Sequence, residues 1–367
     1  MKKSQVFMMA GGGTAGHVVP AVVVARELRR RGYRVVFFGT RHGFEARVLD
    51  ALQFPVEWIE INGLKGVGWR KRLRTLAQLP GCVLKCWRSM RRWRPVALFS
   101  MGGYAAGPPM LAAWLLGTPI VVMEPNAMPG FTTRKMARVV KRALVSFPET
   151  MEWFPDGVAE VTGLPVREEF FDIPPWTPSE TLTLLITGGS QGSHRLNQAS
   201  RESWPLFRES GMKVKILHQA GYREASELKR AFASAGLEGQ VTAFITDMPS
   251  AFAEAGLVVC RSGAGAVAEL AAAGRPSILV PFPFAADDHQ LKNARAMERA
   301  GAARVVLDQQ MDGARLFHEV RQLASDPERL AAMGQAARSL ARPGAARRAA
   351  DVLEEFAREA QKRKPSG

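Results

Sequence analysis

The fold is decided near the start of the chain, by the stretch Val6-Phe7-Met8-Met9-Ala10-Gly11-Gly12-Gly13-Thr14-Ala15-Gly16-His17. Five apolar residues lead into a glycine-rich turn, and a helix over residues 21–31 and an apolar strand over residues 34–38 are expected to follow. Strand, helix and strand in this order predict a βαβ unit and a parallel sheet. Glycines allow close approach of the backbone, and a helix N-terminus offers unpaired N–H groups to a phosphate. The chain is therefore expected to open with an α/β domain that binds a phosphorylated ligand.

The same pattern starts again in the second half of the chain. A strand over residues 181–187 leads into another glycine-rich turn, residues 188–193, and a helix begins near Arg195. The other expected elements are strands over residues 97–100, 119–123, 213–218, 241–244, 257–259 and 277–280, and helices over residues 264–273 and 345–360. A proline-rich stretch at residues 172–178 is the candidate linker. We therefore predict an α/β protein with two doubly wound, Rossmann-like domains, whose ligands bind at the carboxyl ends of the strands and in the cleft between the domains.

Composition narrows the class of protein. A chain of 367 residues with 47% apolar residues fits two domains of ordinary size, each with its own core. The 50 Lys and Arg residues against 34 Asp and Glu residues give a net charge of +16, which favours nucleic acid, phosphorylated substrates or acidic lipid as partners. Three cysteines cannot form a disulfide framework and indicate a reducing compartment. Glycines and prolines interrupt the longest uncharged stretch, residues 95–123, so we expect a cytosolic protein without a spanning helix.

The first glycine-rich turn also satisfies the G-x-G-x-x-G fingerprint of dinucleotide-binding domains, through Gly11, Gly13 and Gly16. That fingerprint expects an acidic residue about 20 positions further on, which holds the ribose. The second strand here leads to Arg41 without an acid, which weakens an NADP-dependent oxidoreductase without excluding it. A tight turn without a ligand is the plainer alternative, and it applies equally to the glycine-rich residues 101–108.

A further candidate site follows the strand at residues 257–259. Residues 260–269 read Cys-Arg-Ser-Gly-Ala-Gly-Ala-Val-Ala-Glu, so small residues open a helix whose dipole favours an anion. Glu269 is placed to accept hydrogen bonds from sugar hydroxyls, although a helix-favouring glutamate is the plainer interpretation. Asp287, Asp288 and His289 indicate either a metal site or a loop that caps the next helix. Because no Asp-x-Asp diphosphate–metal motif occurs, we favour chemistry without a metal.

An ordered set of motifs produces a family resemblance. The set is Gly-Gly-Gly-Thr-Ala-Gly-His-Val-Val-Pro (11–20), Met-Gly-Gly-Tyr (101–104), Glu124 with Asn126, Thr162-Gly163 with Pro165-Val166-Arg167, Gly-Gly-Ser-Gln-Gly (188–192), Arg261-Ser262-Gly263-Ala264 through Glu269, and Asp-Asp-His-Gln (287–290). From about residue 6 to residue 302 the chain thereby resembles the MurG family, the UDP-N-acetylglucosamine:lipid I N-acetylglucosaminyltransferases of peptidoglycan synthesis. The order and spacing of the whole set make the resemblance specific.

The resemblance implies a GT-B fold, in which two Rossmann-like domains face a cleft and the last helix returns to the first domain. Residues 1–164 with the C-terminal helix 345–367 would form the acceptor and membrane-docking domain, and residues 165–344 the UDP-sugar donor domain. The implied reaction is inverting transfer of N-acetylglucosamine from UDP-N-acetylglucosamine to the 4-hydroxyl of the muramoyl sugar of lipid I (undecaprenyl-pyrophosphoryl-MurNAc-pentapeptide). It forms lipid II and needs neither a cofactor nor a metal. Another GT-B transferase acting on a different glycolipid, and a non-catalytic basic binding protein, stay open as alternatives.

The resemblance also assigns substrate contacts by position. It implies that Glu269 holds the ribose hydroxyls, that Ile245 meets the uracil by its backbone, and that Ser190 and the helix start at residues 264–266 hold the diphosphate. The full set of implied contacts is Thr14, Ala15, Gly16, Asn126, Arg167, Ser190, Gln191, Ile245, Ala264, Gly265, Ala266, Val267, Ala268, Glu269 and Gln290. The chain departs from the family pattern, on the acceptor side, at Ala15, Met123, Pro125 and Leu164.

His17 is the candidate catalytic residue. Inverting transfer needs a base that takes the proton of the acceptor hydroxyl, and a neutral imidazole suits that role. The dipole at a helix start favours the neutral ring, because it opposes a positive charge. A hydrogen bond from His17 to the acceptor diphosphate is the alternative. Backbone N–H groups at a helix N-terminus are expected to stabilise the departing UDP.

The positive charge is concentrated in residues 65–94, within a stretch from residue 61 to residue 123 that has no Asp or Glu. Its basic residues are Lys65, Arg70, Lys71, Arg72, Arg74, Lys85, Arg88, Arg91, Arg92 and Arg94, interleaved at near-helical spacing with Leu73, Leu76, Val83, Leu84, Trp87 and Met90. Such a surface suits an anionic membrane. Burial of its apolar side in the core is the alternative, and no motif supports RNA binding.

We therefore expect a peripheral protein on the cytoplasmic face of the plasma membrane. Its expected partners are UDP-N-acetylglucosamine, lipid I and an anionic membrane surface. Nucleic acid is not expected as a partner, and other cell-wall synthesis proteins are possible partners.

Overall fold

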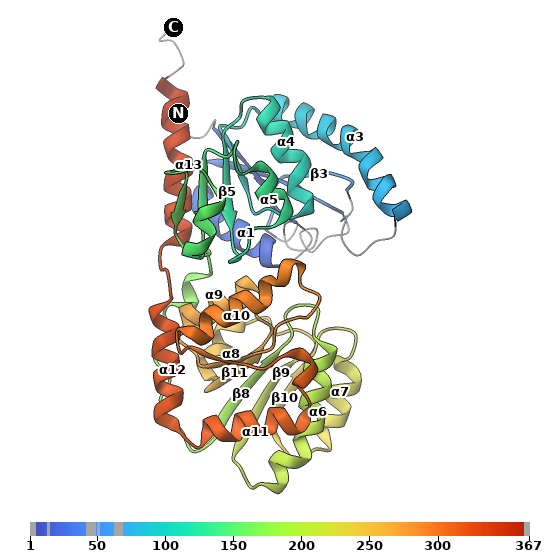
Figure 1. The fold of residues 1–367 in the computed structure, drawn as a ribbon, viewed down its shortest axis with the longest axis vertical. Coiled ribbons are helices and arrows are strands. Elements are labelled where there is room, and N and C mark those ends of the chain that lie inside the picture. The colour runs from blue at the N-terminus through green and yellow to red at the C-terminus, as the bar shows by residue number, and fades with distance from the viewer. Residues whose placement is uncertain (1–4, 13–14, 42–48, 50–51, 62–68, 363–367) are drawn as a thin grey trace. The chain divides into compact units, whose positions relative to one another are not determined.

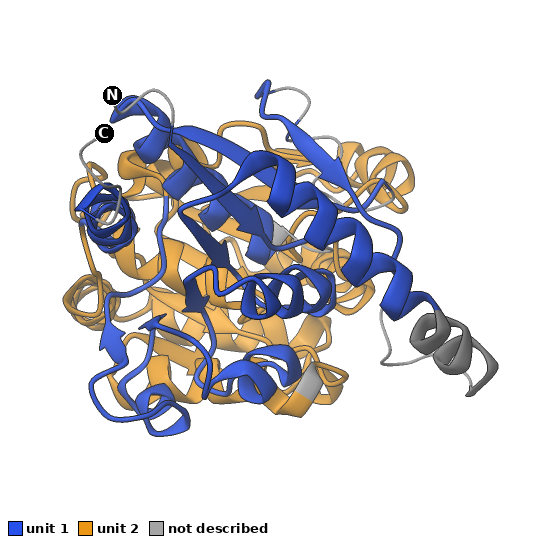
Figure 2. Ribbon diagram, turned by 90° about the horizontal axis from the view of Figure 1, so that it is seen from above, with its two compact units in different colours: residues 1–166, 344–367 blue, residues 167–343 orange. Residues whose placement is uncertain are grey.

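The computed structural model describes residues 5–12, 15–41, 49, 52–61 and 69–362 of the 367-residue chain. The chain forms two compact units, residues 1–166 together with 344–367, and residues 167–343 (Figure 1, Figure 2). Every strand pairing in both units is parallel among the described residues. The two units are thus both built on parallel sheets, as the sequence predicts.

The described part of the first unit contains a seven-stranded sheet in the order β3-β2-β1-β4-β5-β6-β7. The strands are β1 (Val6–Ala10), β2 (Arg34–Gly39), β3 (Val56–Trp58), β4 (Ala97–Ser100), β5 (Ile120–Glu124), β6 (Arg142–Val145) and β7 (Ala159–Val161). β1, β4 and β5 are buried along their whole length, as expected for central strands covered on both faces. Strand order reverses between β1 and β4, and ligands of doubly wound sheets bind at such a reversal point.

The second unit repeats this plan with six strands in the order β10-β9-β8-β11-β12-β13. The strands are β8 (Leu182–Thr187), β9 (Val214–Gln219), β10 (Glu238–Thr242), β11 (Leu257–Cys260), β12 (Ser277–Leu279) and β13 (Ala303–Val305). Here the order reverses between β8 and β11. Thr187 pairs with Cys260, so the loops that follow these two strands leave the same edge of the sheet side by side.

Helices connect the strands. The first unit contains α1 (Ala15–Arg30), α3 (Trp69–Trp93), α4 (Gly107–Leu115), α5 (Phe131–Met136), α13 (Ala345–Lys362) and the short 3-10 helices η2 (Tyr104–Ala106) and η3 (Pro148–Trp153). The second unit contains α6 (His194–Glu209), α7 (Ala225–Ala233), α8 (Met248–Glu254), α9 (Ala264–Ala273), α10 (His289–Arg299), α11 (Gly313–Ala324), α12 (Pro327–Ser339), η4 (Glu168–Phe170), η5 (Ala286–Asp288) and η6 (Asp308–Gln310). In the second unit the helices lie on both sides of the sheet (Figure 1), so the sheet is buried in the core.

The last helix, α13, belongs to the first unit, although the whole second unit precedes it in the chain (Figure 2). Its apolar residues Ala349, Val352 and Leu353 are fully buried, and the helix packs against α1. This return of the C-terminal helix confirms the prediction made for residues 345–360.

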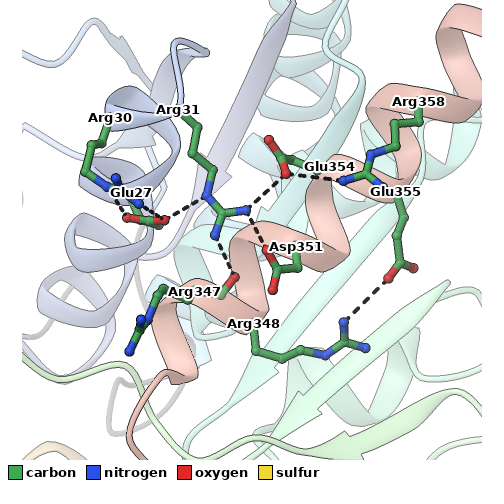
Figure 3. Close-up of polar contacts among 9 residues, drawn as sticks. All are labelled: Glu27, Arg30, Arg31, Arg347, Arg348, Asp351, Glu354, Glu355 and Arg358. Atoms are coloured by element: carbon green, nitrogen blue, oxygen red, sulfur yellow. Dashed lines mark hydrogen bonds and ion pairs between the residues drawn. The ribbon is translucent and has the colours of Figure 1, made fainter.

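An ionic cluster joins α1 to α13 (Figure 3). The Arg31 guanidinium donates to Asp351 Oδ1 at 2.6 Å, to Glu354 Oε2 at 3.1 Å and to Glu27 Oε1 at 2.7 Å. Hydrogen bonds from Arg30 and Arg31 lower the pKa of Glu27 to about 2, so this carboxylate stays charged at neutral pH. Because α1 begins beside the first glycine-rich turn, α13 anchors the helix that carries His17 in its first turn.

Two predicted elements differ from the structure by more than two residues at their start, and the other predicted bounds differ by at most two. The first helix starts at Ala15 instead of residue 21 and includes Pro20, because Val18 and Ala21 pack into the core and compensate for the hydrogen bond that proline cannot form. The strand predicted at residues 241–244 is β10 at Glu238–Thr242. It is an edge strand with exposed residues at its start, so it lacks the apolar pattern on which the prediction relied.

Candidate active site

The glycine-rich turn after β8 packs backbone against backbone on the turn after β9. Gly192 has φ +74°, and a Cβ on it would lie 2.1 Å from the Ala220 carbonyl oxygen. Gly221 has φ +80°, and a Cβ on it would lie 2.5 Å from the Gln191 carbonyl oxygen. Only glycine fits at these two positions. Ser190 and Gln191 therefore lie in a turn whose backbone is held close to the neighbouring loop.

We expect Gly192→Ala to lower the free energy of unfolding by about 3 kcal/mol, the sum of a left-handed backbone penalty and an overpacking cost. Gly189 provides a matched control, because it also has a left-handed φ of +79° but has nothing within 4 Å of its Cβ position. Gly189→Ala should therefore cost only about 1 kcal/mol. Urea unfolding of both variants measures the difference. Equal losses would contradict a close contact with Ala220.

The N-terminus of α9 follows β11 and is open to a ligand. Its N-cap, Gly263, forms no side-chain cap, so the first backbone N–H groups of the helix lack that partner. A Cβ on Gly265 would meet nothing within 4 Å, which leaves room beside the first turn. Ser262 Oγ donates to the Gln290 carbonyl oxygen at 2.8 Å and thereby holds the start of α10 next to the start of α9. Such a helix start suits a phosphate.

Glu269 lies in α9 with a carboxylate that has no hydrogen-bond partner among the described residues. Burial raises its pKa to about 7, and the positive charge of Arg167 acts in the opposite direction. A half-buried carboxylate without a donor is unusual in a folded protein, because buried polar groups are normally hydrogen-bonded. Glu269 is therefore suited to accept hydrogen bonds from a ligand.

In the first unit, the turns after β1 and β4 meet at the reversal point of the sheet. A Cβ on Gly11 would lie 2.8 Å from Met101 Cβ. Gly103 has φ +76°, and a Cβ on it would lie 3.3 Å from His17 Cε1 and 3.5 Å from His17 Nδ1. The imidazole of His17 thus lies against the Gly103 backbone.

A buried carboxylate organises the loop that carries Asn126. Glu124 ends β5 and is 2% exposed. It accepts hydrogen bonds from the backbone N–H of Asn126, the side-chain amide of Asn126 and the backbone N–H of Gly130, each at 3.2 Å. Burial raises the pKa of Glu124 to about 7 in spite of these donors. Thr132 Oγ1 donates to the Gly103 carbonyl oxygen at 3.0 Å, which joins this loop to the turn beside His17.

Comparison with known proteins matches both units to one family. Residues 7–145 match the glycosyltransferase family 28 N-terminal domain and residues 183–355 match the C-terminal domain of that family. The crystal structure of Acinetobacter baumannii MurG aligns with a TM-score of 0.78 at 32% identity, over 96% of this chain and 99% of that one. A UDP-N-acetylglucosamine--N-acetylmuramyl-(pentapeptide) pyrophosphoryl-undecaprenol N-acetylglucosamine transferase of Solibacter usitatus is 60% identical over 352 residues, 96% of each chain. The chain belongs to the MurG family.

The chain is therefore a glycosyltransferase with the GT-B fold of the MurG family, and the predicted fold class is confirmed. A transferase of the same description from Anaeromyxobacter dehalogenans is 42% identical over 356 residues, 96% of this chain and 93% of that protein. The matches extend over both units, so they do not depend on a single motif.

The positions implied by the MurG resemblance lie in both units. The first unit carries Gly16 and His17 in the first turn of α1, and Asn126 after β5, while Thr14 and the side chain of Ala15 lie outside the described residues. The second unit carries Arg167, Ser190, Gln191, Ile245, Ala264, Gly265, Ala266, Val267, Ala268, Glu269 and Gln290. There the structure places Gln290 beside α9 and Arg167 near Glu269.

Two departures from the MurG-family pattern are buried apolar residues. Met123 lies within β5 and is fully buried, and Leu164 is 5% exposed. Both side chains are buried, which accounts for an apolar residue at each position.

Sequence reasoning missed two buried polar residues of the second unit. His218 Nε2 lies 3.0 Å from Asn197 Oδ1, and burial lowers the pKa of His218 to about 3. Gln219 is 2% exposed and contacts both the turn after β8 and Ile245. The available signal was the polar pair His218-Gln219 directly after the apolar residues Ile216 and Leu217 at the carboxyl end of the strand.

The metal interpretation of residues 287–289 has no structural support in the described part of the chain. No group of three or more His, Cys, Asp or Glu residues there is arranged to hold a metal ion. Asp287 and Asp288 have left-handed backbone angles, φ 55° and 53°, and the Asp288 side chain does not cap α10. Transfer without a metal stays a prediction that a chelator can test.

Proposed function

We propose that this chain transfers N-acetylglucosamine from UDP-N-acetylglucosamine to the 4-hydroxyl of the muramoyl sugar of lipid I, with inversion, and so forms lipid II. The observation that carries the proposal is the 60% identity to the Solibacter usitatus transferase over 96% of both chains. The donor would bind the second unit, residues 167–343, and the acceptor the first unit, residues 1–166 with 344–367.

The proposed donor site in the second unit is supported by the loops after β8 and β11, which lie next to each other. The diphosphate is expected to accept hydrogen bonds from the first N–H groups of α9 and from Ser190, while the Glu269 carboxylate accepts the ribose hydroxyls. Ile245 meets the uracil by its backbone. When the bond between the sugar and UDP breaks, negative charge grows on the β-phosphate, and the helix dipole stabilises it without moving any group.

The proposed acceptor site in the first unit is supported by the position of the His17 imidazole against the Gly103 backbone. In the proposed step the 4-hydroxyl oxygen forms a bond to the anomeric carbon, the bond from that carbon to the UDP oxygen breaks, and an imidazole nitrogen of His17 takes the hydroxyl proton. The electron pair of the broken bond leaves with UDP. Asn126, held by Glu124, is expected to contact the sugar.

Transfer of labelled N-acetylglucosamine from its UDP sugar to a lipid I analogue tests the proposal. We expect a labelled lipid II product at undiminished rate in excess EDTA. A protein that binds UDP but leaves the lipid I analogue unlabelled would contradict the acceptor assignment. Loss of transfer in EDTA would contradict the metal-free mechanism.

We further propose that the first unit docks on an anionic membrane. No described helix is both long and apolar enough to cross a bilayer. α3 packs against α4 (Figure 1), and on α3 Met90 is buried in the core and Trp87 packs against it, so part of the apolar side of this helix faces inward. Exposed apolar side chains come mainly from α4, where Trp114 is 52% and Leu115 is 58% exposed, and on α3 itself Leu84 is 44% exposed.

Exposed basic side chains of α3 accompany these residues on the neighbouring helix; the described ones are Lys85, Arg88, Arg91 and Arg92, and Arg94 follows the end of the helix. Lys65 and the side chains of residues 69–77 lie outside the described part of the chain. Apolar side chains beside cations suit the headgroup region of an anionic bilayer. The α4 residues are thus the sharper target for a test than the core-facing apolar residues of α3.

We expect the double variant Trp114→Ser, Leu115→Ser to bind phosphatidylglycerol vesicles about tenfold or more weakly than the wild type, because it removes two large apolar side chains from the interface. Tyr222, 68% exposed in the second unit, provides the control variant Tyr222→Ser. Sedimentation with vesicles at low and high salt measures both. Binding that persists in the double variant, or that ignores salt, would contradict docking through this surface.

A further inference from the structure

Gln219 connects two segments of the second unit that the sequence separates widely. Its side-chain nitrogen Nε2 donates to the Gly189 carbonyl oxygen at 2.9 Å and to Thr187 Oγ1 at 3.1 Å. Its side-chain oxygen Oε1 accepts the backbone N–H of Ile245 at 2.9 Å. One buried amide thus bonds the glycine-rich turn after β8 on one side and the segment after β10 on the other.

The backbone next to Gln219 reinforces the same connection. The N–H of Ala220 donates to the Thr242 carbonyl oxygen at 2.9 Å, and the N–H of Gly221 donates to the Ala243 carbonyl oxygen at 3.1 Å. On the other side, Gly221 lies against the backbone of the glycine-rich turn, where a Cβ on it would be 2.5 Å from the Gln191 carbonyl oxygen. Residues 219–221 therefore lie between the two segments and contact both.

We propose that Gln219 is a positioning residue for the sugar nucleotide. It sets the separation between the turn that carries Ser190, expected to hold the diphosphate, and Ile245, expected to meet the uracil. This inference rests on the proposed function, because the two segments have these roles only if the second unit binds UDP-N-acetylglucosamine. Gln219 touches neither substrate in this proposal and acts through the backbone on both sides.

The amide is required because its two ends have opposite hydrogen-bonding roles. The nitrogen side must donate, since the Gly189 carbonyl can only accept, and the oxygen side must accept, since the Ile245 N–H can only donate. A glutamate at this position would keep the bond to Ile245 and place a carboxylate oxygen against the Gly189 carbonyl. A ligand that contacts both segments binds more tightly when their separation is fixed, because binding then does not have to order the two segments.

Calorimetric titration of the full chain with UDP and with uridine tests this inference. UDP spans both segments, whereas uridine lacks the diphosphate and needs only the segment near Ile245. For Gln219→Met we expect UDP binding to weaken about tenfold or more and uridine binding to weaken much less, so that the preference for UDP over uridine falls by about fivefold or more. In the transferase assay the donor KM should rise more than kcat falls.

Two other variants accompany this test. Gln240 is an exposed glutamine on β10, and Gln240→Met should leave both affinities unchanged. Thr187→Val removes one acceptor of the Gln219 amide and also the acceptor of the Gly189 N–H in the same turn. It should change the preference for UDP in the same direction but less, which keeps the test available if Gln219→Met fails to fold.

The outcomes are distinguishable. An unchanged preference for UDP over uridine in Gln219→Met, or in Thr187→Val if the former does not fold, overturns the inference while the proposed function stands. Equal weakening of both ligands also overturns it, because general loosening of the unit predicts that result. A wild-type protein that binds neither UDP nor uridine overturns the proposed function and the inference together.

Discussion

Replacement of His17 by alanine is expected to lower kcat for N-acetylglucosamine transfer by about 10²–10⁴-fold, the range found when a general base is removed. The reason is that the acceptor hydroxyl is a weak nucleophile unless its proton leaves while the oxygen attacks. UDP affinity should be unchanged, because the residues proposed to hold UDP lie in the second unit, while His17 lies in the first unit against Gly103. Steady-state kinetics with a lipid I analogue and calorimetric titration with UDP measure the two quantities separately.

A second variant separates the base from the alternative role of His17. Glutamine donates and accepts hydrogen bonds but takes no proton at neutral pH, so His17→Gln would preserve a hydrogen bond to the acceptor diphosphate. If His17 is the base, His17→Gln loses as much kcat as His17→Ala. If His17 binds the diphosphate, His17→Gln recovers much of the activity and the acceptor KM changes instead. The exposed His318 on α11 provides the control, and His318→Ala should leave kcat unchanged.

Central elements of the fold could be predicted from the sequence because each carries its own local pattern. β1 and β4 are buried apolar runs, and α9 is bounded by glycines, so their ranges coincide with the prediction. The strands β3, β6, β7 and β13 were not predicted. β3, β7 and β13 each have three residues and lie at an edge of their sheet, and pairing with a neighbour, rather than an apolar run, defines them. β6 is an inner strand, but it has only four residues and begins with an exposed arginine. An edge strand lacks the burial on both faces that makes a central strand recognisable.

The candidate site also contains features that the sequence shows and contacts that only the structure shows. The glycine-rich turns and the small residues at the start of α9 are visible in the sequence, because a turn and a helix start are local features. The role of Gln219 is not visible, because its partners Gly189 and Ile245 lie 30 and 26 positions away. Glu124 belongs to the motif that carried the resemblance, but only the structure shows that it bonds the Asn126 loop. Contacts of this kind depend on strand order, which no single segment specifies.

Glu269→Gln is expected to weaken UDP binding at pH 8 by about 10- to 100-fold, because hydrogen bonds from ribose hydroxyls to a carboxylate are stronger than those to an amide. In the wild type, UDP affinity should rise as the pH increases from 6 to 8. Burial raises the pKa of the unliganded Glu269 to about 7, so at pH 6 binding must first remove a proton from the group that is to accept the hydroxyls. Calorimetry with UDP across this range measures both effects, and an exposed carboxylate variant, Glu359→Gln, provides the control.

The same substitution is expected to stabilise the unliganded protein at pH 8. The folded-state pKa of Glu269, about 7, lies above the value of 4.5 expected in the unfolded chain, so the folded state holds a proton that the unfolded state releases as the pH rises between these values. Near pH 4 the Glu269 side chain is protonated in both states and does not lower the free energy of unfolding. As the pH rises through this window, its ionisation lowers the free energy of unfolding, by about 2 kcal/mol at pH 8 when partial solvent access is allowed for. Thermal unfolding should show Glu269→Gln matching the wild type at pH 4 and exceeding it at pH 8, with saturating UDP reversing the order. If Glu269→Gln is no more stable than the wild type at pH 8, the buried carboxylate does not destabilise the unliganded protein. That result would contradict the main physical argument that Glu269 binds a ligand.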